Sequence, residues 1–164
     1  MKGYNIIVIF NKNGDKILLC KRRNKNPYKG LFNFVGGKIE ENENGLDAAY
    51  RELEEETSIT KSDITLSHFM DFKYYFEDLY LEVYVGKLNK NINVYGTKNL
   101  LYWSPLNVNF FDTNRYAGDG NIGHIMLKIL KDIEKNNWNK LERIYLLWKS
   151  FLIVLMQMVK FQHF

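Results

Sequence analysis

The sequence has little cysteine, proline or histidine. Its 164 residues include one cysteine, Cys20, two prolines and three histidines. A lone cysteine excludes an internal disulfide, and Cys20 is expected to be a buried strand residue because no activating partner lies near it in the sequence. His68 and His124 lack the spacing of metal ligands and are interpreted as structural residues. The chain opens without the pattern of a signal peptide, so we expect a cytoplasmic location.

The sequence also lacks an apolar run long enough to cross a bilayer. The most apolar stretch, residues 144–159, has 16 residues and contains Lys149, whereas a spanning helix needs about 20. We therefore expect no membrane span. Residues 137–164 are predicted to form an apolar helical extension that packs on the domain or makes a homodimer contact. Binding to a membrane surface is the weaker alternative, because cationic residues are few there.

The composition is that of a folded protein with an uneven distribution of charge. Hydrophobic residues make up 46% and charged residues 26% of the chain, which excludes disorder for most of it and predicts one globular domain over residues 1–136. The net charge is +4, yet residues 38–56 hold eight acidic residues against Lys38 and Arg51, a net of −6, so the rest carries +10. This pattern favours a cation site and an anionic substrate.

Local patterns predict a mixture of strands and helices, an α/β arrangement. Apolar or aromatic runs with turn residues between them indicate strands, and apolar residues at helical spacing indicate helices. The predicted strands cover residues 4–10, 16–20, 31–35, 64–76, 79–88 and 100–104. Helices are predicted after Asn44, over residues 122–133 with an apolar stripe packed on the sheet, and over about 141–160. The run 118–123 matches G-x-G-x-x-G but follows no convincing buried strand, so a turn before the helix is favoured over a dinucleotide site.

The helix after Asn44 has two different faces. Its apolar side, expected to face the core, consists of Leu46, Ala49, Tyr50 and Leu53. Glu52, Glu55 and Glu56 stand at i, i+3 and i+4, so their carboxylates share another face. Such a cluster can be a solvated surface, but crowded carboxylates repel one another unless a cation lies among them. Oxygen ligands of this kind suit Mg²⁺ or Mn²⁺ rather than zinc.

The spacing of glycine, arginine and glutamate over residues 37–59 favours a cation site over a solvated surface. From Gly37 the sequence reads Gly, five residues, Glu, seven residues, Arg-Glu, an aliphatic residue, one residue, Glu-Glu, one residue, Ser58 and an aliphatic residue. This segment resembles the Nudix hydrolase box at eight of its nine defined positions, with Ser58 in place of the last glycine. That position is expected to be left-handed, where serine costs about 1 kcal/mol without removing a ligand.

The resemblance implies a fold and an activity. The implied fold is an α/β/α sandwich with a mixed β-sheet and a loop-helix-loop catalytic motif. The implied activity is Mg²⁺-dependent, or Mn²⁺-dependent, hydrolysis of a diphosphate linkage in a nucleoside di- or triphosphate or a nucleoside diphosphate derivative, with MutT-like clearance of damaged nucleotides as one candidate. A non-catalytic Nudix module that senses a nucleotide-like metabolite is the alternative. The partner implied is a small nucleotide, without a stable nucleic-acid complex.

The resemblance also implies roles for particular residues. Glu52, Glu55 and Glu56 would be metal ligands together with the carbonyl of Gly37, and that of Gly36 is a further candidate. Arg51 would orient the carboxylates, Glu43 would support the loop, and Glu52 would also help to deprotonate the attacking water. Candidate substrate-binding residues are Arg22, Arg23 and Lys38, each of which is also interpretable as a solvated surface residue. In the loop before the later helix, Asp119 is a candidate auxiliary carboxylate and Asn121 a candidate base-reading residue.

Overall fold

The computed structural model describes residues 1–23, 28–96 and 99–136. The predicted helical extension, residues 137–164, lies outside the described residues. The chain divides into two compact units, Met1–Ser104 and a second that begins at Pro105, and each is described by itself. The assignment of residues 1–136 to one domain stays a prediction.

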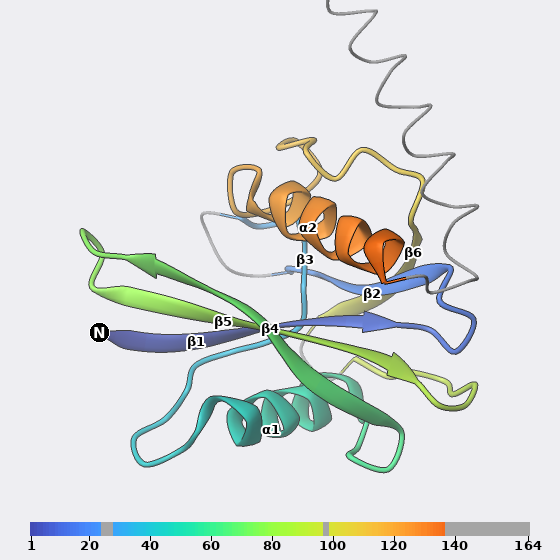
Figure 1. The fold of residues 1–164 in the computed structure, drawn as a ribbon, viewed down its shortest axis with the longest axis horizontal. Helices are drawn as coiled ribbons and strands as arrows, with labels where there is room; N and C mark the ends of the chain where they lie inside the picture. The colour runs from blue at the N-terminus through green and yellow to red at the C-terminus, as the bar shows by residue number, and fades with distance from the viewer. Residues whose placement is uncertain (24–27, 97–98, 137–164) are drawn as a thin grey trace, which may run out of the picture. The chain divides into compact units, whose positions relative to one another are not determined.

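The first unit contains the mixed sheet that the sequence predicts (Figure 1). Its strands are β1 Lys2–Phe10, β2 Lys16–Lys21, β3 Phe32–Asn33, β4 Ile64–Tyr74, β5 Leu79–Leu88 and β6 Leu100–Pro105. The order is β3-β2-β1-β5-β4, and β6 pairs with β2. The central pair β1 and β5 is parallel, whereas β1–β2, β2–β3 and β4–β5 are antiparallel. The predicted α/β class is confirmed, and the consecutive strands β1–β2 and β4–β5 each pair as an antiparallel hairpin.

Polar residues form the turn that joins β1 to β2. The Asn11 Oδ1 accepts hydrogen bonds from the backbone N–H groups of Asp15 and Lys16, each at 3.0 Å. Gly14 has φ 75°, a left-handed conformation that glycine adopts without strain. These turn residues explain why β1 and β2 pair with each other, as their composition predicts.

Helix α1, Gly45–Thr57, carries the acidic cluster. Asn44 is its N-cap and accepts a hydrogen bond from the Asp47 N–H at 2.9 Å, which satisfies one of the unpaired amides of the first turn. The helix ends at Ser58, whose φ of 62° is left-handed, as predicted. Each end of α1 is therefore determined by a local signal.

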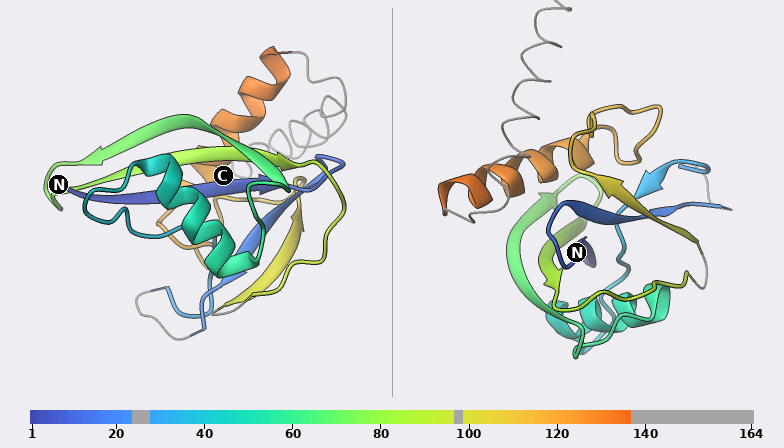
Figure 2. Two further views of the ribbon diagram at one scale, coloured as in Figure 1. Left: turned by 90° about the horizontal axis from the view of Figure 1, so that it is seen from below. Right: turned by 90° about the vertical axis from the view of Figure 1, so that its right-hand side faces the viewer.

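The core of this unit lies between α1 and one face of the sheet, across which α1 runs (Figure 2). Ala49 and Leu53 are buried there, as predicted. The prediction for Leu46 is wrong, because its side chain is 39% exposed. The first turn of α1 approaches β5 through Gly45 instead, where an added Cβ would collide with the Glu82 carboxyl group. That close approach turns Leu46 outward.

The second unit contains the predicted later helix, α2, Asn121–Lys135. Its apolar stripe is buried as expected and consists of Ile122, Ile125, Met126, Ile129, Leu130 and Ile133. The packing of this stripe on the sheet stays a prediction. Within the described part of the chain, no helix has the length and apolar character to cross a membrane.

Candidate metal and catalytic site

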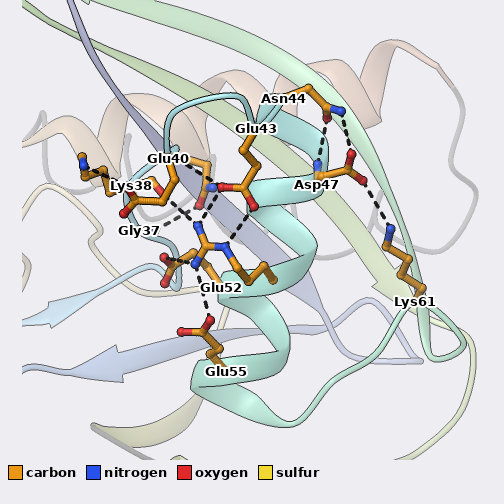
Figure 3. A network of polar contacts seen from close by, with 11 residues as sticks. Gly37, Lys38, Glu40, Glu43, Asn44, Asp47, Glu52, Glu55 and Lys61 are labelled. Carbon is orange, nitrogen blue, oxygen red and sulfur yellow. Dashed lines mark hydrogen bonds and ion pairs between the residues drawn. The ribbon is translucent and has the colours of Figure 1, made fainter.

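A polar network joins α1 to the loop before it and includes Glu43, Glu52 and Glu55, which Figure 3 labels. Arg51 contacts each of these three carboxylates. Its Nε and Nη2 donate to the two carboxylate oxygens of Glu43, both at 2.9 Å. Its Nη2 also donates to the carbonyl of Lys38 at 2.9 Å. The guanidinium therefore binds one carboxylate as a fork and the loop backbone as well. These hydrogen bonds lower the pKa of Glu43 and raise that of Arg51.

The remaining side of the Arg51 guanidinium faces the glutamates of the helix. Its Nη1 donates to Glu52 Oε1 at 2.7 Å and lies 3.5 Å from Glu55 Oε1. The Glu52 side chain is only 13% exposed, whereas that of Glu55 is 48% exposed. Arg51 therefore holds Glu52 in one orientation and leaves Glu55 room to change its own.

The loop at Gly36 and Gly37 lies directly against two of the glutamates. A Cβ added at Gly37 would collide with the Glu52 carboxyl group, so only glycine allows the loop backbone to come this close. The N–H of Gly36 donates to Glu56 Oε2 at 3.5 Å, a long hydrogen bond. The structure thus brings together the predicted residues Gly37, Glu52 and Glu56, with Arg51 and Glu55 beside them.

These side chains are near one another without forming a closed metal cage. Across residues 1–23, 28–96 and 99–136, no group of three histidine, cysteine, aspartate or glutamate side chains converges as a metal site would. The carbonyl of Gly37, one of the predicted ligands, accepts a hydrogen bond from the Asn5 N–H at 2.8 Å and keeps its second lone pair. Ligation by these groups stays a prediction.

The predicted substrate-binding residues of the first unit lie on or near its surface. Lys38 is exposed and pairs with Glu40 at 2.9 Å, which raises the pKa of the lysine. Arg22 follows β2, and its backbone N–H donates to the carbonyl of Leu31 at 3.1 Å. The N–H of Arg23 lies 3.4 Å from Asn99 Oδ1. Their roles toward substrate stay predictions.

Two further candidates belong to the second unit. Asp119 lies in the loop before α2 with a left-handed φ of 52°, and Asn121 is the first residue of that helix. His124 packs edge-on against Phe111, with ring centroids 5.1 Å apart. The contacts of Asp119 and Asn121 with a substrate stay predictions.

Cys20 is buried in its strand, as the sequence predicts, and His68 contacts Asp71 and Tyr84. Cys20 is 4% exposed in β2, and burial raises the pKa of its thiol to about 12. His68 Nε2 lies 2.7 Å from Asp71 Oδ1, and its ring packs edge-on against Tyr84. Neither residue joins a metal-binding group among the described side chains.

One residue beside the site is not predicted from the sequence. Asn5 on β1 is 3% exposed, and its Oδ1 accepts a hydrogen bond from the Gly37 N–H at 3.0 Å. The available signal is that Asn5 is polar and shares its side of the strand with the buried Ile7 and Ile9. An inward polar residue within an apolar strand points to a specific partner.

Comparisons with known proteins agree with this geometry. A family model described as the NUDIX domain matches residues 1–103. The CTP pyrophosphohydrolase of Escherichia coli (strain K12) is 36% identical over 70 residues, 42% of this chain and 52% of that protein, so the match spans about half of its length. The 8-oxo-dGTP diphosphatase of Buchnera aphidicola subsp. Schizaphis graminum (strain Sg) is 33% identical over 104 residues, 62% of this chain and 76% of that protein.

Solved structures show a similar fold. The dihydroneopterin triphosphate pyrophosphohydrolase of E. coli has a TM-score of 0.59 at 18% identity, covering 77% of this chain and 95% of the other. A binary complex of the Ap4A hydrolase of C. elegans has a TM-score of 0.60 at 23% identity, covering 79% and 98%. At these identities the likeness concerns the fold alone.

Proposed function

Because the chain belongs to the NUDIX family of hydrolases, which act on phosphoric anhydride bonds, we propose that it cleaves a diphosphate linkage in a nucleoside di- or triphosphate or a nucleoside diphosphate derivative. The family and the fold class predicted from the sequence are thereby confirmed. Two relatives are named for CTP and 8-oxo-dGTP, which supports a nucleoside triphosphate as the first substrate class to test. Clearance of damaged nucleotides is the corresponding candidate role.

The observation that carries this proposal is the contact of one loop with two glutamates of the box. Gly37 packs against the Glu52 carboxyl group, and Gly36 donates to Glu56. We propose that Glu52, Glu55 and Glu56 hold Mg²⁺ or Mn²⁺ together with the carbonyl of Gly37 or Gly36. The donors are all oxygens, which suits a hard divalent cation.

The present orientation of the carboxylates is compatible with this role. Arg51 holds Glu52 and Glu55 through one nitrogen, so these carboxylates are partly neutralised by a cationic side chain. The Glu55 side chain is 48% exposed and can turn toward its neighbours without displacing buried atoms. A metal ion, when bound, would neutralise the diphosphate and lower the pKa of a water molecule.

The residues of the chain supply positioning and proton transfer. Attack of water at phosphorus forms one P–O bond and breaks the anhydride P–O bond, and the leaving phosphate carries away the electron pair. Glu52, oriented by the 2.7 Å hydrogen bond from Arg51, is placed to accept the proton of the attacking water. Glu43 in turn fixes the Arg51 guanidinium through its two hydrogen bonds. Lys38, Arg22 and Arg23 are the proposed cations for the substrate phosphates.

The experiment compares two charge-neutral substitutions on the same helix. The purified chain and its Glu52→Gln and Glu54→Gln variants are incubated with Mg²⁺ and CTP, 8-oxo-dGTP, a dinucleoside polyphosphate, a nucleotide sugar or ADP-ribose. The phosphate-containing products, including nucleotides, sugar phosphates, phosphate and pyrophosphate, are separated by anion-exchange chromatography and measured. Glu54 is exposed on α1 and stands outside the proposed ligand set, so it controls for the loss of a negative charge. We expect Mg²⁺-dependent turnover that is lost in Glu52→Gln and kept in Glu54→Gln.

The same experiment distinguishes a hydrolase from a non-catalytic binding module. Tight binding of one of these nucleotides without turnover, unchanged in Glu52→Gln, would contradict a hydrolase and favour a sensor. A cytoplasmic location and a homodimer contact through residues 137–164 stay predictions, and those residues lie outside the described part of the chain.

A further inference from the structure

We infer that Asn5 is a positioning residue for the proposed metal site, because its side chain replaces the backbone carbonyl in the hydrogen bond to Gly37. The inference rests on the proposed function, since it concerns the loop that meets Glu52 and Glu56. Asn5 lies on β1, far from the box in sequence, and touches neither glutamate in any contact that the structure gives. Its influence therefore acts through the loop.

The loop before α1 pairs with β1 through isolated antiparallel bridges. Tyr4 lies opposite Lys38, and Ile7 lies opposite Val35. The N–H of Ile7 donates to the Val35 carbonyl at 2.8 Å, and the N–H of Ile39 donates to the Gly3 carbonyl at 2.9 Å. In this register Asn5 lies opposite Gly37.

The Asn5 and Gly37 pair departs from a regular ladder. In a regular antiparallel ladder, such a pair exchanges two backbone N–H to carbonyl hydrogen bonds. Here the Asn5 N–H donates to the Gly37 carbonyl at 2.8 Å, but the Gly37 N–H donates to the side-chain Oδ1 of Asn5 at 3.0 Å. The side chain has taken the place of the backbone acceptor.

This substitution coincides with the bend that forms the site. Gly36, the next residue, has φ 145°, and a Cβ added there would collide with the backbone carbonyl oxygen of Asn5. The bend directs the Gly36 N–H to Glu56 and brings the Gly37 backbone against Glu52. If the Gly37 amide returned to the backbone carbonyl of Asn5, the loop would straighten and both contacts would change.

The amide nitrogen of Asn5 argues against a purely stabilising role. Asn5 Nδ2 is buried and has no hydrogen-bond partner among the described residues. If the Asn5 side-chain amide were turned over, its NH2 group would face the Gly37 N–H, and two donors would meet. The Gly37 N–H therefore determines that the Asn5 oxygen points toward it. A buried donor without a partner destabilises the folded state. An apolar residue of similar size would remove this unpaired donor but would leave the Gly37 N–H without its acceptor, so the two effects on stability oppose each other.

The test measures metal binding and loop geometry apart from turnover. Mn²⁺ is titrated, without substrate, into the full-length wild type and its Asn5→Leu, Asn5→Asp and Ile7→Val variants and followed by electron paramagnetic resonance. Hydrogen exchange at the Gly37 amide and thermal melting are recorded in parallel. Leucine has a similar shape without the acceptor, and aspartate keeps an oxygen for the Gly37 N–H. Ile7→Val is the matched control, because Ile7 lies on the same side of β1, pairs with Val35 rather than with Gly37, and keeps its backbone pairing when its side chain is shortened.

We expect Asn5→Leu to weaken Mn²⁺ binding by about 10- to 100-fold, the usual effect of removing a residue that orients a metal site. Its Gly37 amide should exchange at a changed rate, while its melting temperature stays at or above that of Ile7→Val. Asn5→Asp should keep the wild-type exchange rate at Gly37. If Asn5→Leu does not fold, Asn5→Ala carries the same expectation.

Three results would overturn different parts of this reasoning. Equal Mn²⁺ affinity in the wild type and Asn5→Leu would contradict the role of Asn5 while leaving the proposed function intact. A wild-type chain that binds no Mn²⁺ would contradict the proposed function itself. A parallel loss of stability and affinity in both Asn5→Leu and Ile7→Val would show that Asn5 acts only through the fold.

Discussion

Replacing Gly37 with alanine places a methyl group where the loop touches Glu52. The new Cβ would lie 2.5 Å from Glu52 Oε1 and closer still to Glu52 Cδ and Oε2, whereas ordinary contact begins at 3.4 Å, so the carboxylate must move by more than about 0.9 Å. Gly37 is not among the residues with positive φ, so alanine adds no backbone strain there. The perturbation is therefore a displacement of one carboxylate.

The size of the effect follows from that displacement. Misplacing a catalytic group by about 1 Å can cost a factor of about 10² in rate, which corresponds to about 2.7 kcal/mol in activation free energy. The 2.7 Å hydrogen bond from Arg51 to Glu52 must change as well. Extra volume in a packed region lowers the free energy of unfolding by about 1–3 kcal/mol, so the variant should remain folded but less stable.

The assay is kcat/KM for Mg²⁺-dependent hydrolysis of the best nucleotide found for the wild type. The control is Ile17→Val, a buried core residue of β2, which costs about 0.5–1.5 kcal/mol of stability without touching the site. We expect Gly37→Ala to lose about two orders of magnitude in kcat/KM and Ile17→Val to keep wild-type activity. Wild-type kcat/KM in Gly37→Ala would refute the close packing of the loop against Glu52.

Three smaller predictions follow from other residues. Ser58→Gly should raise the free energy of unfolding by about 0.4–1 kcal/mol, because φ at this cap is 62°; urea denaturation showing no gain would contradict the strain. The pKa of Asp63 is lowered from 3.8 to about 2 by hydrogen bonds from Lys90 and Thr60, so its stabilisation is present above pH 3.8 and lost as pH falls toward 2. Asp63→Asn should melt lower at neutral pH and lack that loss, and an unchanged pH profile of melting would contradict it. Cys20, buried with a pKa of about 12, should react with a thiol reagent at mildly alkaline pH only after denaturant is added; rapid labelling of the native chain would show that the thiol is accessible.

The elements that the sequence predicts well are those with local signals. Asn44 caps α1 by a hydrogen bond to a residue three positions ahead, and the Asn11 turn is closed within five residues. The helical period places Glu52, Glu55 and Glu56 on one face regardless of what lies opposite. Patterns of this kind depend on few residues, so a single sequence is enough to recognise them.

Contacts between distant segments are not predictable in this way. The antiparallel pairing of Val35 and Lys38 with β1 has no signal in the sequence, because Gly36 and Gly37 interrupt the strand pattern between them. From the sequence alone, Asn5 is one polar residue in an apolar strand. Its role becomes apparent only from its hydrogen bond with Gly37, which lies 32 positions away in the sequence.

Helix packing shows the same limit. Leu46 has the spacing of a core residue, but Gly45 makes the close approach to Glu82 on β5. The helical period predicts which side of the helix a residue lies on, but it does not predict how closely each turn of the helix approaches the sheet. The exposure of Leu46 therefore could not be predicted from the sequence.

The central claim is that the loop at Gly36 and Gly37 and the glutamates of α1 form one metal site. Crystals soaked in Mn²⁺ and measured for its anomalous scattering test it most directly, because the ion itself is located. We predict an anomalous peak about 2.1 Å from carboxylate oxygens of Glu52 and Glu56 and from a carbonyl oxygen of the loop. A peak elsewhere on the chain, with no oxygen of Glu52 or Glu56 bound to the ion, would contradict the account.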